Sequence, residues 1–403
     1  MTGPARPWLA DGGQLRWPDM RPYDAAAVDV EAPGIWRYQT TFGLPNAVRR
    51  ITLGEGRTPL VRAATGGAAM GGAEVAYKLE FAQPTGSYKD RGFAALFTLL
   101  ASEGVTDAVE DSSGNAGASA AAYGAAAGIG VTLFVPRAAA DGVRVAQARA
   151  YGAIIDAEAP TRAGAAERAC AAAAAGAVYA SHVYQPMYLA GLRTIAFELY
   201  EQLGGAPDDV VVPVGHGGLL LGLALGFDAL LAGGHIAHLP RLHGVQAAAA
   251  APLADAFASG ADAPMPLPRP PAATRAGGIA IGDPPRGAAV LAAVRRSRGT
   301  LSALAEDEIA SAQAALARRG WFVEGTSAVV APLAERLAGG YSRERATERA
   351  TERATEPSGR VVVAVLTGSG LKDAPVADAR STGSTTPPER IPHTDDRFAA
   401  RRG

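Results

Sequence analysis

The stretch VVVPVGHGGLLLGLALGF, residues 210–227, passes from a β-branched run through Gly215-His216-Gly217-Gly218 into an apolar segment of helical character. A short β-branched run is typical of a buried strand, and glycines let the backbone approach a ligand closely. Backbone N–H groups at the start of a helix attract anions, so this turn is a candidate phosphate site. A tight strand-to-helix turn without a ligand would use similar residues. The spacing fits neither a Walker A loop nor GxGxxG.

The alternation of strand and helix continues along the chain. Apolar β-branched runs lie at 131–136, 153–156, 209–215 and 360–368, and alanine-rich segments with helical spacing lie at 116–127, 141–150, 161–175, 188–203, 218–232 and 306–319. This alternation predicts an α/β fold with parallel sheets flanked by helices. Because the strands form two groups, before and after about residue 190, we expect two sheets with a cleft between them.

Composition narrows the class of protein. The 403 residues are 48% hydrophobic and 19% charged, with a formal net charge of -1, which favours a soluble protein and does not favour nucleic acid or a membrane surface as a partner. The single cysteine, Cys170, excludes an internal disulfide, and its alanine-rich surroundings predict a buried thiol. The N-terminus shows no apolar signal region, and we expect a cytoplasmic location.

The stretch PTGSYKDRG, residues 84–92, holds one of only three lysines in the chain. Lys89 follows a Gly-Ser turn and precedes a segment, 92–97, that is typical of a helix, so its amine is expected near a helix N-terminus, where the protonated form is disfavoured. A neutral lysine can form a Schiff base with an aldehyde, whereas arginine cannot. The alternative is a surface lysine paired with Asp90.

Two further motifs carry polar side chains at expected strand ends. DSSGNAG, residues 111–117, places backbone N–H groups where a helix begins, which suits a carboxylate, although a plain helix cap would also use serine and asparagine. VLTGSGLKD, residues 365–373, places Thr367 where the last strand ends, and its hydroxyl could donate to a ring nitrogen. A simple strand-end turn is the alternative there.

In this order and spacing the motifs resemble the fold-type II pyridoxal-phosphate enzymes, also described as tryptophan synthase β-like, and most closely the threonine synthase family. The resemblance covers roughly residues 35–373. Besides the four motifs it includes IWRY (35–38), TLGEGRTPLV (52–61) and VEGTSAV (323–329). It implies two domains with twisted, mainly parallel sheets and pyridoxal 5'-phosphate as the cofactor.

The resemblance implies a role for each matching position. Lys89 matches the lysine that carries the cofactor and then moves protons at Cα and Cβ. Asn115 matches the asparagine that binds the cofactor's 3-oxygen, and Thr367 matches the hydroxyl partner of the pyridine nitrogen. The loop that holds the cofactor phosphate matches Gly215, His216, Gly217, Gly218 and Leu219, and the loop that takes the substrate carboxylate matches Ser112, Ser113, Gly114 and Asn115.

Three departures from the family pattern stand out. His182 and Tyr188 occupy positions where threonine synthases carry an asparagine and an arginine for the substrate's γ-phosphate, which affects the expected specificity. His216 replaces an asparagine of the phosphate loop, where binding through the backbone tolerates the change. Many relatives have an N-terminal Cys-rich metal knuckle, but residues 8–15 hold no cysteine, so no metal is expected.

The expected organisation combines composition with this resemblance. A Pro-, Gly- and Asp-rich N-terminal arm (1–35) precedes a large cofactor domain, formed by 36–92 and 190–375, and a small domain, 93–189. The proline-rich segment 262–286 is predicted to be a surface or active-site loop. The charged insertion 340–359 contains the sequence RATE three times, at 345–356. It is predicted to be an exposed helix or linker. The polar stretch 376–403 is predicted to be a disordered tail.

The leading functional hypothesis is a lyase that eliminates phosphate from an amino acid such as O-phospho-L-homoserine and adds water to give L-threonine. The main alternative is a serine/threonine ammonia-lyase or a β-replacement synthase on the same scaffold. A non-catalytic binding protein is disfavoured by Lys89, Asn115 and Thr367, and a nicotinamide dehydrogenase by the lack of GxGxxG. The only expected partners are a small amino-acid substrate and a second copy of the chain in a homodimer.

Overall fold

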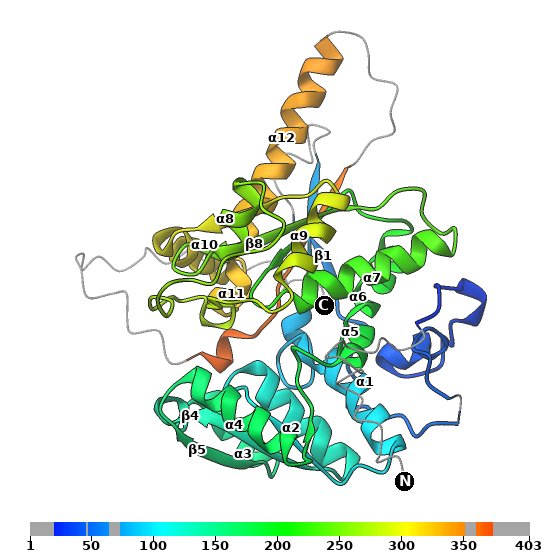
Figure 1. Cartoon of the computed structure of the whole chain (residues 1–403). Coiled ribbons are helices and arrows are strands. Elements are labelled where there is room, and N and C mark those ends of the chain that lie inside the picture. The colour runs from blue at the N-terminus through cyan, green and yellow to red at the C-terminus, as the bar shows by residue number, and fades with distance from the viewer. Residues whose placement is uncertain (1–19, 46, 64–72, 351–359, 374–403) are drawn as a thin grey trace, which may run out of the picture.

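The computed structural model describes residues 20–45, 47–63, 73–350 and 360–373. The expected tail at 376–403, the segment 8–15 and the last part of the charged repeat, 351–359, lie outside these ranges. The described chain forms two sheets, with the smaller one below the larger one in Figure 1. The predicted α/β class with two mainly parallel sheets is therefore confirmed, while the exact domain boundaries stay a prediction.

The larger sheet combines strands from both ends of the chain. Its order is β1 (Leu60–Arg62), β2 (Glu74–Lys78), β10 (Val361–Val365), β7 (Asp209–Pro213), β8 (Arg241–Ala247) and β9 (Leu301–Leu304). Only β1 is antiparallel to its neighbour. Strands β7 and β10 are nearly continuous runs of valine, which suits central strands covered by helices on both faces.

The smaller sheet lies within one continuous part of the chain. Its order is β5 (Ile154–Ala159), β4 (Gly130–Pro136), β3 (Asp107–Glu110) and β6 (Val178–Tyr179), and all pairs are parallel. The run 131–136, predicted as a strand, corresponds to β4. None of the helices within the described ranges has the length and apolar character needed to span a membrane.

The six predicted helical segments are all present, with one difference. They correspond to α2 (Asn115–Ala127), α3 (Val143–Ala150), α4 (Arg162–Ala174), α5 (Pro186–Leu192) with α6 (Thr194–Leu203), α7 (Gly218–Ala232) and α10 (Glu306–Arg318). The segment predicted as one helix at 188–203 is divided at Arg193, whose guanidinium donates to the carbonyls of Arg21 and Thr41.

Helix α1 (Lys89–Ser102) contains the segment 92–97, which was predicted to be helical. The remaining helices have weaker signals in the sequence: α8 (Pro252–Ala258), α9 (Gly287–Arg296), α11 (Gly325–Ala328) and α12 (Val330–Ala350), together with 3-10 turns that include η2 (Gly34–Thr41), η4 (Glu80–Ala82), η6 (Gly277–Ile279) and η7 (Gly370–Lys372). The backbone of α12 continues into the charged repeat as far as Ala350. The segment 262–286 is irregular apart from η6, as its prolines predict.

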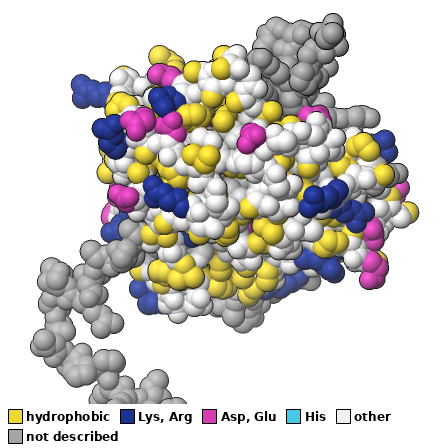
Figure 2. All heavy atoms as spheres, turned by 90° about the horizontal axis from the view of Figure 1, so that it is seen from below, with side chains coloured by type: hydrophobic (Ala, Val, Ile, Leu, Met, Phe, Trp, Pro, Cys, Tyr) yellow, Lys and Arg dark blue, Asp and Glu magenta, His cyan; other side chains and the backbone are white. Residues whose placement is uncertain are grey.

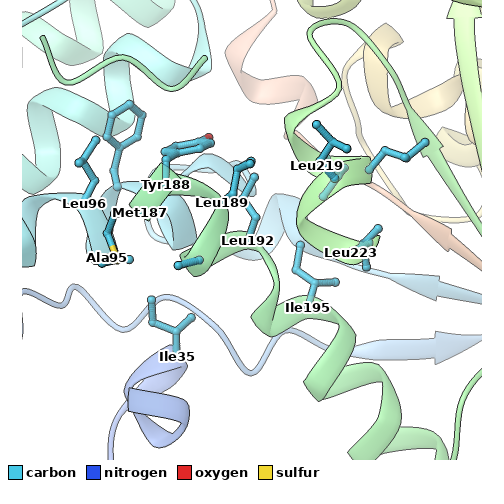
Figure 3. Packing of buried hydrophobic residues seen from close by; sticks show 14 of the residues in the cluster. Ile35, Ala95, Leu96, Met187, Tyr188, Leu189, Leu192, Ile195, Leu219 and Leu223 are labelled. Carbon is cyan, nitrogen blue, oxygen red and sulfur yellow. The ribbon is translucent and has the colours of Figure 1, made fainter. Parts of the chain in front are cut away.

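Helix α5 is central to the hydrophobic core. Figure 3 shows its side chains Met187, Tyr188, Leu189 and Leu192 between residues of α1 and residues of α6 and α7. Glycines permit this close packing, because a Cβ on Gly191 would lie 2.0 Å from the carbonyl oxygen of Arg91. The core thus fixes the start of α1 relative to the start of α7.

Two predictions made from composition, a buried Cys170 and an N-terminal arm, can be compared with the structure. Cys170 is exposed on α4, so the expectation of a buried thiol is wrong: alanine-rich helices bury one face only, and Cys170 lies on the other. In the described part of the expected arm, Tyr23 is buried against Phe197 of α6. On the face shown in Figure 2, acidic and basic side chains are interspersed among hydrophobic ones.

A buried group of four charged residues connects α1 to the larger sheet. The Arg91 guanidinium on α1 donates to both carboxylate oxygens of Glu80, at 2.7 and 2.8 Å, and to both of Glu198 on α6, at 2.6 and 2.7 Å. Lys78, the last residue of β2, also donates to Glu198 at 2.7 Å. Two cations therefore balance two carboxylates, and all four side chains are fully or almost fully buried.

Candidate active site

A cavity of about 500 Å³ lies where the two sheets meet, at the carboxyl ends of β3, β7 and β10. Ligands of parallel α/β proteins bind at this edge of a sheet. The irregular segment 262–286 contributes part of its wall. All residues predicted for the site line this one cavity: Lys89, Ser112, Ser113, Gly114, Asn115, Gly215, His216, Gly217, Gly218, Leu219 and Thr367.

Lys89 is the first residue of α1, and its neighbours in sequence are fixed by buried contacts. Asp90 accepts hydrogen bonds from the backbone N–H and hydroxyl of Thr85, at 2.7 and 2.6 Å, and from Ser119, at 2.6 Å. The alternative of a surface lysine paired with Asp90 therefore finds no support. Within the described residues the Lys89 ammonium makes no hydrogen bond or ion pair, and it lies 4.7 Å from the centre of the Tyr88 ring. Its amine is left for a ligand of the cavity.

The glycine-rich turn leads from β7 into α7. Gly217 has a φ of +86° and caps the helix, and a Cβ on it would lie 2.2 Å from Val290. A Cβ on Gly215 would lie 3.1 Å from the backbone of Ile279. Because no side chain of the described residues caps α7, the N–H groups of its first turn remain for an anion. The positive φ and the close approach of Val290 require glycine at Gly217, so the turn presents its backbone N–H groups to the cavity.

The turn after β3 begins α2 and carries Asn115. The Asn115 amide Nδ2 donates to both oxygens of Glu324, at 2.9 Å each, while its Oδ1 is buried without a hydrogen-bond partner in the described chain. The Ser112 hydroxyl accepts from the N–H of Gly114 at 3.1 Å, and no side chain caps α2. A second helix N-terminus therefore faces the cavity.

The hydroxyl of Thr367 lies just beyond the end of β10. It is 3.0 Å from the hydroxyl of Ser327, which accepts from the N–H of Gly368 at 2.7 Å. These contacts fix the Thr367 side chain at the cavity wall. The position agrees with the predicted place at a strand end, and its role toward a ring nitrogen stays a prediction.

His182, just after β6, and Tyr188, on α5, line the same cavity. The His182 ring is 2.6 Å from Glu110 through Nδ1, and it stacks edge-on near Tyr188 and His216, with ring centres 6.2 and 5.7 Å away. Burial raises the pKa of Tyr188 well above its usual value, so its hydroxyl stays neutral. The two departures from the family pattern therefore lie together, next to the phosphate turn.

Several charged residues of the cavity have no motif in the sequence. Arg144 donates to Glu324 at 2.8 Å and to Asp373 at 2.6 Å, and Arg162 forms an ion pair with Asp111 at 3.2 Å. The arginines come from alanine-rich helices without local motifs, and their partners are distant in sequence. Glu324 and Asp373 did have a signal, because they lie in the VEGTSAV and VLTGSGLKD stretches. Together with Arg275 and Arg286, these arginines favour anionic ligands.

The histidine of the phosphate turn permits a test of its predicted backbone role. Burial, with Arg162, Lys89 and Arg286 nearby, lowers the pKa of His216 to about 3, so the folded protein keeps this ring neutral. The unfolded chain binds a proton below about pH 6.5, so this histidine makes the folded state lose stability as the pH falls from 6.5 toward 3.

We expect His216→Asn to remove about 1 kcal/mol of the acid-induced loss of stability near pH 5.5 in the protein without ligand. Affinity for an anion in the turn should change less than about threefold, since backbone N–H groups do the binding. Urea unfolding at pH 7.5 and pH 5.5, with a titration of inorganic phosphate, measures both quantities. A tenfold loss of phosphate affinity would show that the side chain, not the backbone, binds the anion.

Comparisons with known proteins agree with this geometry. A family model described as "Pyridoxal-phosphate dependent enzyme" matches residues 51–368. Threonine synthase of Methanocaldococcus jannaschii is 35% identical over 297 residues, which are 73% of this chain and 73% of that protein. Threonine synthase of Mycobacterium tuberculosis is 34% identical over 330 residues, or 81% of this chain and 85% of that one.

Solved structures show the same architecture with other activities in their names. A threonine deaminase of T.th. superposes with a TM-score of 0.61 at 28% identity and covers 79% of this chain and 94% of its own. A processed threonine deaminase isoform 2 from Solanum lycopersicum has a TM-score of 0.63 at 20% identity, covering 88% of this chain and 94% of its own, and supports the fold alone.

Proposed function

This chain belongs to the family of pyridoxal-phosphate-dependent enzymes, and from that premise we propose that it is a lyase of the threonine synthase type that converts O-phospho-L-homoserine and water into L-threonine and phosphate. The observation that carries the proposal is the lone Lys89 amine at a cavity that also holds an anion cradle, in a chain about one-third identical to threonine synthases over most of its length.

The described residues fit pyridoxal 5'-phosphate at three points. The turn from Gly215 to Leu219 offers N–H groups that no described side chain caps, and Gly217 has no room for a Cβ because Val290 packs against it, so the turn presents backbone, as a phosphate cradle requires. The buried Oδ1 of Asn115 lacks a partner among the described residues, and Asn115 lines the same cavity, where the phenolic hydroxyl of a ligand could donate to this oxygen. Thr367 offers a hydroxyl, a neutral partner for a pyridine nitrogen.

When bound, the cofactor supplies an aldehyde for attachment to an amine and an electron sink for the amino-acid carbons. Lys89 would hold it covalently and, once released by the substrate amine, would move protons at Cα and Cβ as a general base. Its position at the start of α1 is fixed by Asp90 and Arg91, so the amine is directed by a rigid backbone. The turn from Ser112 to Asn115 would bind the substrate carboxylate at the uncapped start of α2.

The substrate's phosphate requires positive charge that Tyr188 does not provide. Four arginines line the cavity, and Arg275, which is exposed, makes no ion pair with any described residue. We therefore assign the electrostatic attraction of the phosphate dianion to these arginines in place of the family's arginine. We also propose, from the family resemblance, that the protein is a homodimer and is located in the cytoplasm.

One specific observation favours a second function. Tyr188, buried and neutral, occupies the position of the family's phosphate-binding arginine, and the superposable structures include threonine deaminases. A serine/threonine ammonia-lyase or a β-replacement synthase would need no site for a γ-phosphate. Both functions share Lys89 and the phosphate turn, so substrate turnover has to distinguish them.

We expect the purified protein with its cofactor to release inorganic phosphate from O-phospho-L-homoserine and to form threonine in equal amount. Serine and threonine should give 2-oxo acid at a kcat/KM at least about 100-fold lower, because they lack the phosphate dianion that the arginines of the cavity attract. Phosphate release and amino-acid analysis measure the first reaction, and a coupled 2-oxo-acid assay measures the second. Rapid 2-oxo-acid formation without phosphate turnover would establish the ammonia-lyase instead.

A further inference from the structure

A buried acid and a histidine form a pair in the wall of the cavity, apart from the residues discussed as cofactor contacts. Glu110 is the last residue of β3 and is fully buried, and His182 follows β6 and is 8% exposed. The Glu110 carboxyl is 2.6 Å from His182 Nδ1. The ring makes no other hydrogen bond within the described residues and lines the cavity, so Nε2 is left for whatever occupies it.

The surroundings of the pair determine where its protons lie. Burial, reinforced by Asp111, raises the pKa of Glu110 well above its usual value, although Arg162 and Lys89 oppose this. Burial, reinforced by Lys89, His216, Arg162 and Arg286, lowers the pKa of His182 well below its usual value. The 2.6 Å contact and these two directions favour a protonated carboxyl that donates to Nδ1, with the single ring hydrogen on Nε2.

The tautomer has a chemical consequence. If the carboxyl proton moves to Nδ1, the ring keeps its hydrogen on Nε2, so an N–H faces the cavity in both arrangements. The ring can then give up the Nε2 proton and replace it at Nδ1 with the proton of Glu110, without ever becoming an imidazolate. A histidine without an acid partner at Nδ1 could not do this from its neutral form.

We propose that Glu110 and His182 are a proton-donating pair for the substrate's leaving group, with His182 as the catalytic residue and Glu110 as the positioning residue that resupplies its proton. This inference rests on the proposed function, in which a carbon–oxygen bond is broken. A phosphate monoester dianion that left without a proton would become a trianion, and the hydroxyl of serine or threonine would leave as hydroxide. Either leaving group therefore benefits from a donor.

The proton balance closes over one turnover. As the carbon–oxygen bond breaks, its electron pair goes to the leaving oxygen, and that oxygen takes the proton of His182 Nε2. The Glu110 proton moves to Nδ1, which leaves a carboxylate beside a neutral ring. When water adds, its hydroxyl goes to carbon and its remaining proton returns to Nε2, after which the Nδ1 proton returns to Glu110.

A metal site is the competing reading of the same residues. Glu110, Asp111 and His182 offer three ligand atoms within 4.8 Å of one another. However, Asp111 already accepts from the Tyr179 hydroxyl at 2.9 Å and pairs with Arg162, while Glu110 and His182 bind each other. A cationic arginine on one ligand disfavours a metal ion, and mutual satisfaction of the other two favours the proton pair.

The experiment compares two substrates of the same carbon skeleton in Glu110→Gln and His182→Gln. With O-phospho-L-homoserine we expect kcat to fall about 100-fold or more in both variants, the usual contribution of a general acid. With 2-amino-4-chlorobutanoate, whose chloride needs no proton, kcat should change less than about threefold. In Glu110→Gln the amide still donates to Nδ1, so KM for the phosphate substrate should stay within about threefold of wild type. His238→Gln and Glu158→Gln, both on exposed residues, are matched controls.

Failure of the inference differs from failure of the proposed function. Equal losses with both substrates, or no loss with either, would overturn the donor pair. Wild-type protein that releases no phosphate from O-phospho-L-homoserine would count against the proposed function, and the comparison would move to serine and 3-chloroalanine, where the same pattern is expected.

A readout without turnover tests the pair in any case. Nitrogen-15 NMR of the protein without cofactor should show His182 as a neutral ring with its hydrogen on Nε2 between about pH 6 and 8. The same tautomer should persist in Glu110→Gln. A His182 ring that titrates in this range, or one with its hydrogen on Nδ1 alone, would overturn the proposal.

Discussion

Replacing Lys89 with alanine is expected to abolish the visible absorbance of the lysine-bound cofactor and to lower kcat by at least about 10³-fold, since one residue serves as attachment point and general base. Lys89→Arg should have the same effect although it keeps the positive charge, because a guanidinium does not lose its proton to react with a carbonyl. The absorption spectrum of the protein with added cofactor and the release of phosphate from O-phospho-L-homoserine measure both effects.

The folded structure should survive these two changes. The Lys89 ammonium makes no hydrogen bond or ion pair with the described residues, so the midpoint of urea unfolding without cofactor should stay close to that of wild type. An arginine variant that retained the absorbance and full activity would refute the assignment of Lys89. A variant that unfolded would instead reveal a structural contribution of this side chain.

Replacing Arg91 with methionine is expected to destabilise the protein by about 3–5 kcal/mol, the usual cost of removing one partner from a buried ion pair. The change leaves Glu80 and Glu198 with Lys78 as the only remaining cation of the group. Because Arg91 is two residues beyond Lys89, the start of α1 should also become less rigid, and the affinity for the cofactor should fall. Urea unfolding and a cofactor titration measure these two effects.

Arg296→Met is the matched control for this prediction. Arg296 forms an ion pair with Asp228 at 2.6 Å on the surface, where the two side chains are 55% and 34% exposed. Such a pair contributes about 1 kcal/mol or less. If the Arg91 variant lost no more stability than this control, the buried group would not hold α1 in place.

Local patterns were sufficient for the architecture. The valine runs of β7 and β10 and the alanine-rich helices were located from residue types alone, because burial on both faces demands apolar strands and the helical period is short-range. The division of the helix at Arg193 was missed. The Arg193 guanidinium binds carbonyls of residues 21 and 41, which are 172 and 152 positions away, and such contacts cannot be predicted from neighbouring residues.

The site residues could be predicted where all parts of a motif lie in one short segment of the sequence. Asn115 and the turn at 215–219 each combine a strand end, small residues and a helix start, and Lys89 combines a Gly-Ser turn with a helix start, so their chemistry is visible within a few residues. The resemblance to the threonine synthase family added their roles, and the family itself is confirmed by the comparisons. The roles of the individual residues remain to be tested by the substitutions described above.

By itself, then, the sequence determined the fold class, the family with its cofactor, and the lysine and glycine motifs, because each depends on short-range order. Only the tertiary structure decided which charges meet. Glu110 and His182 are 72 positions apart, and Arg91 and Glu198 are 107 apart. A carboxylate becomes a proton donor or a structural counter-ion according to its burial and its partner, and neither property is encoded by the residues next to it in the chain.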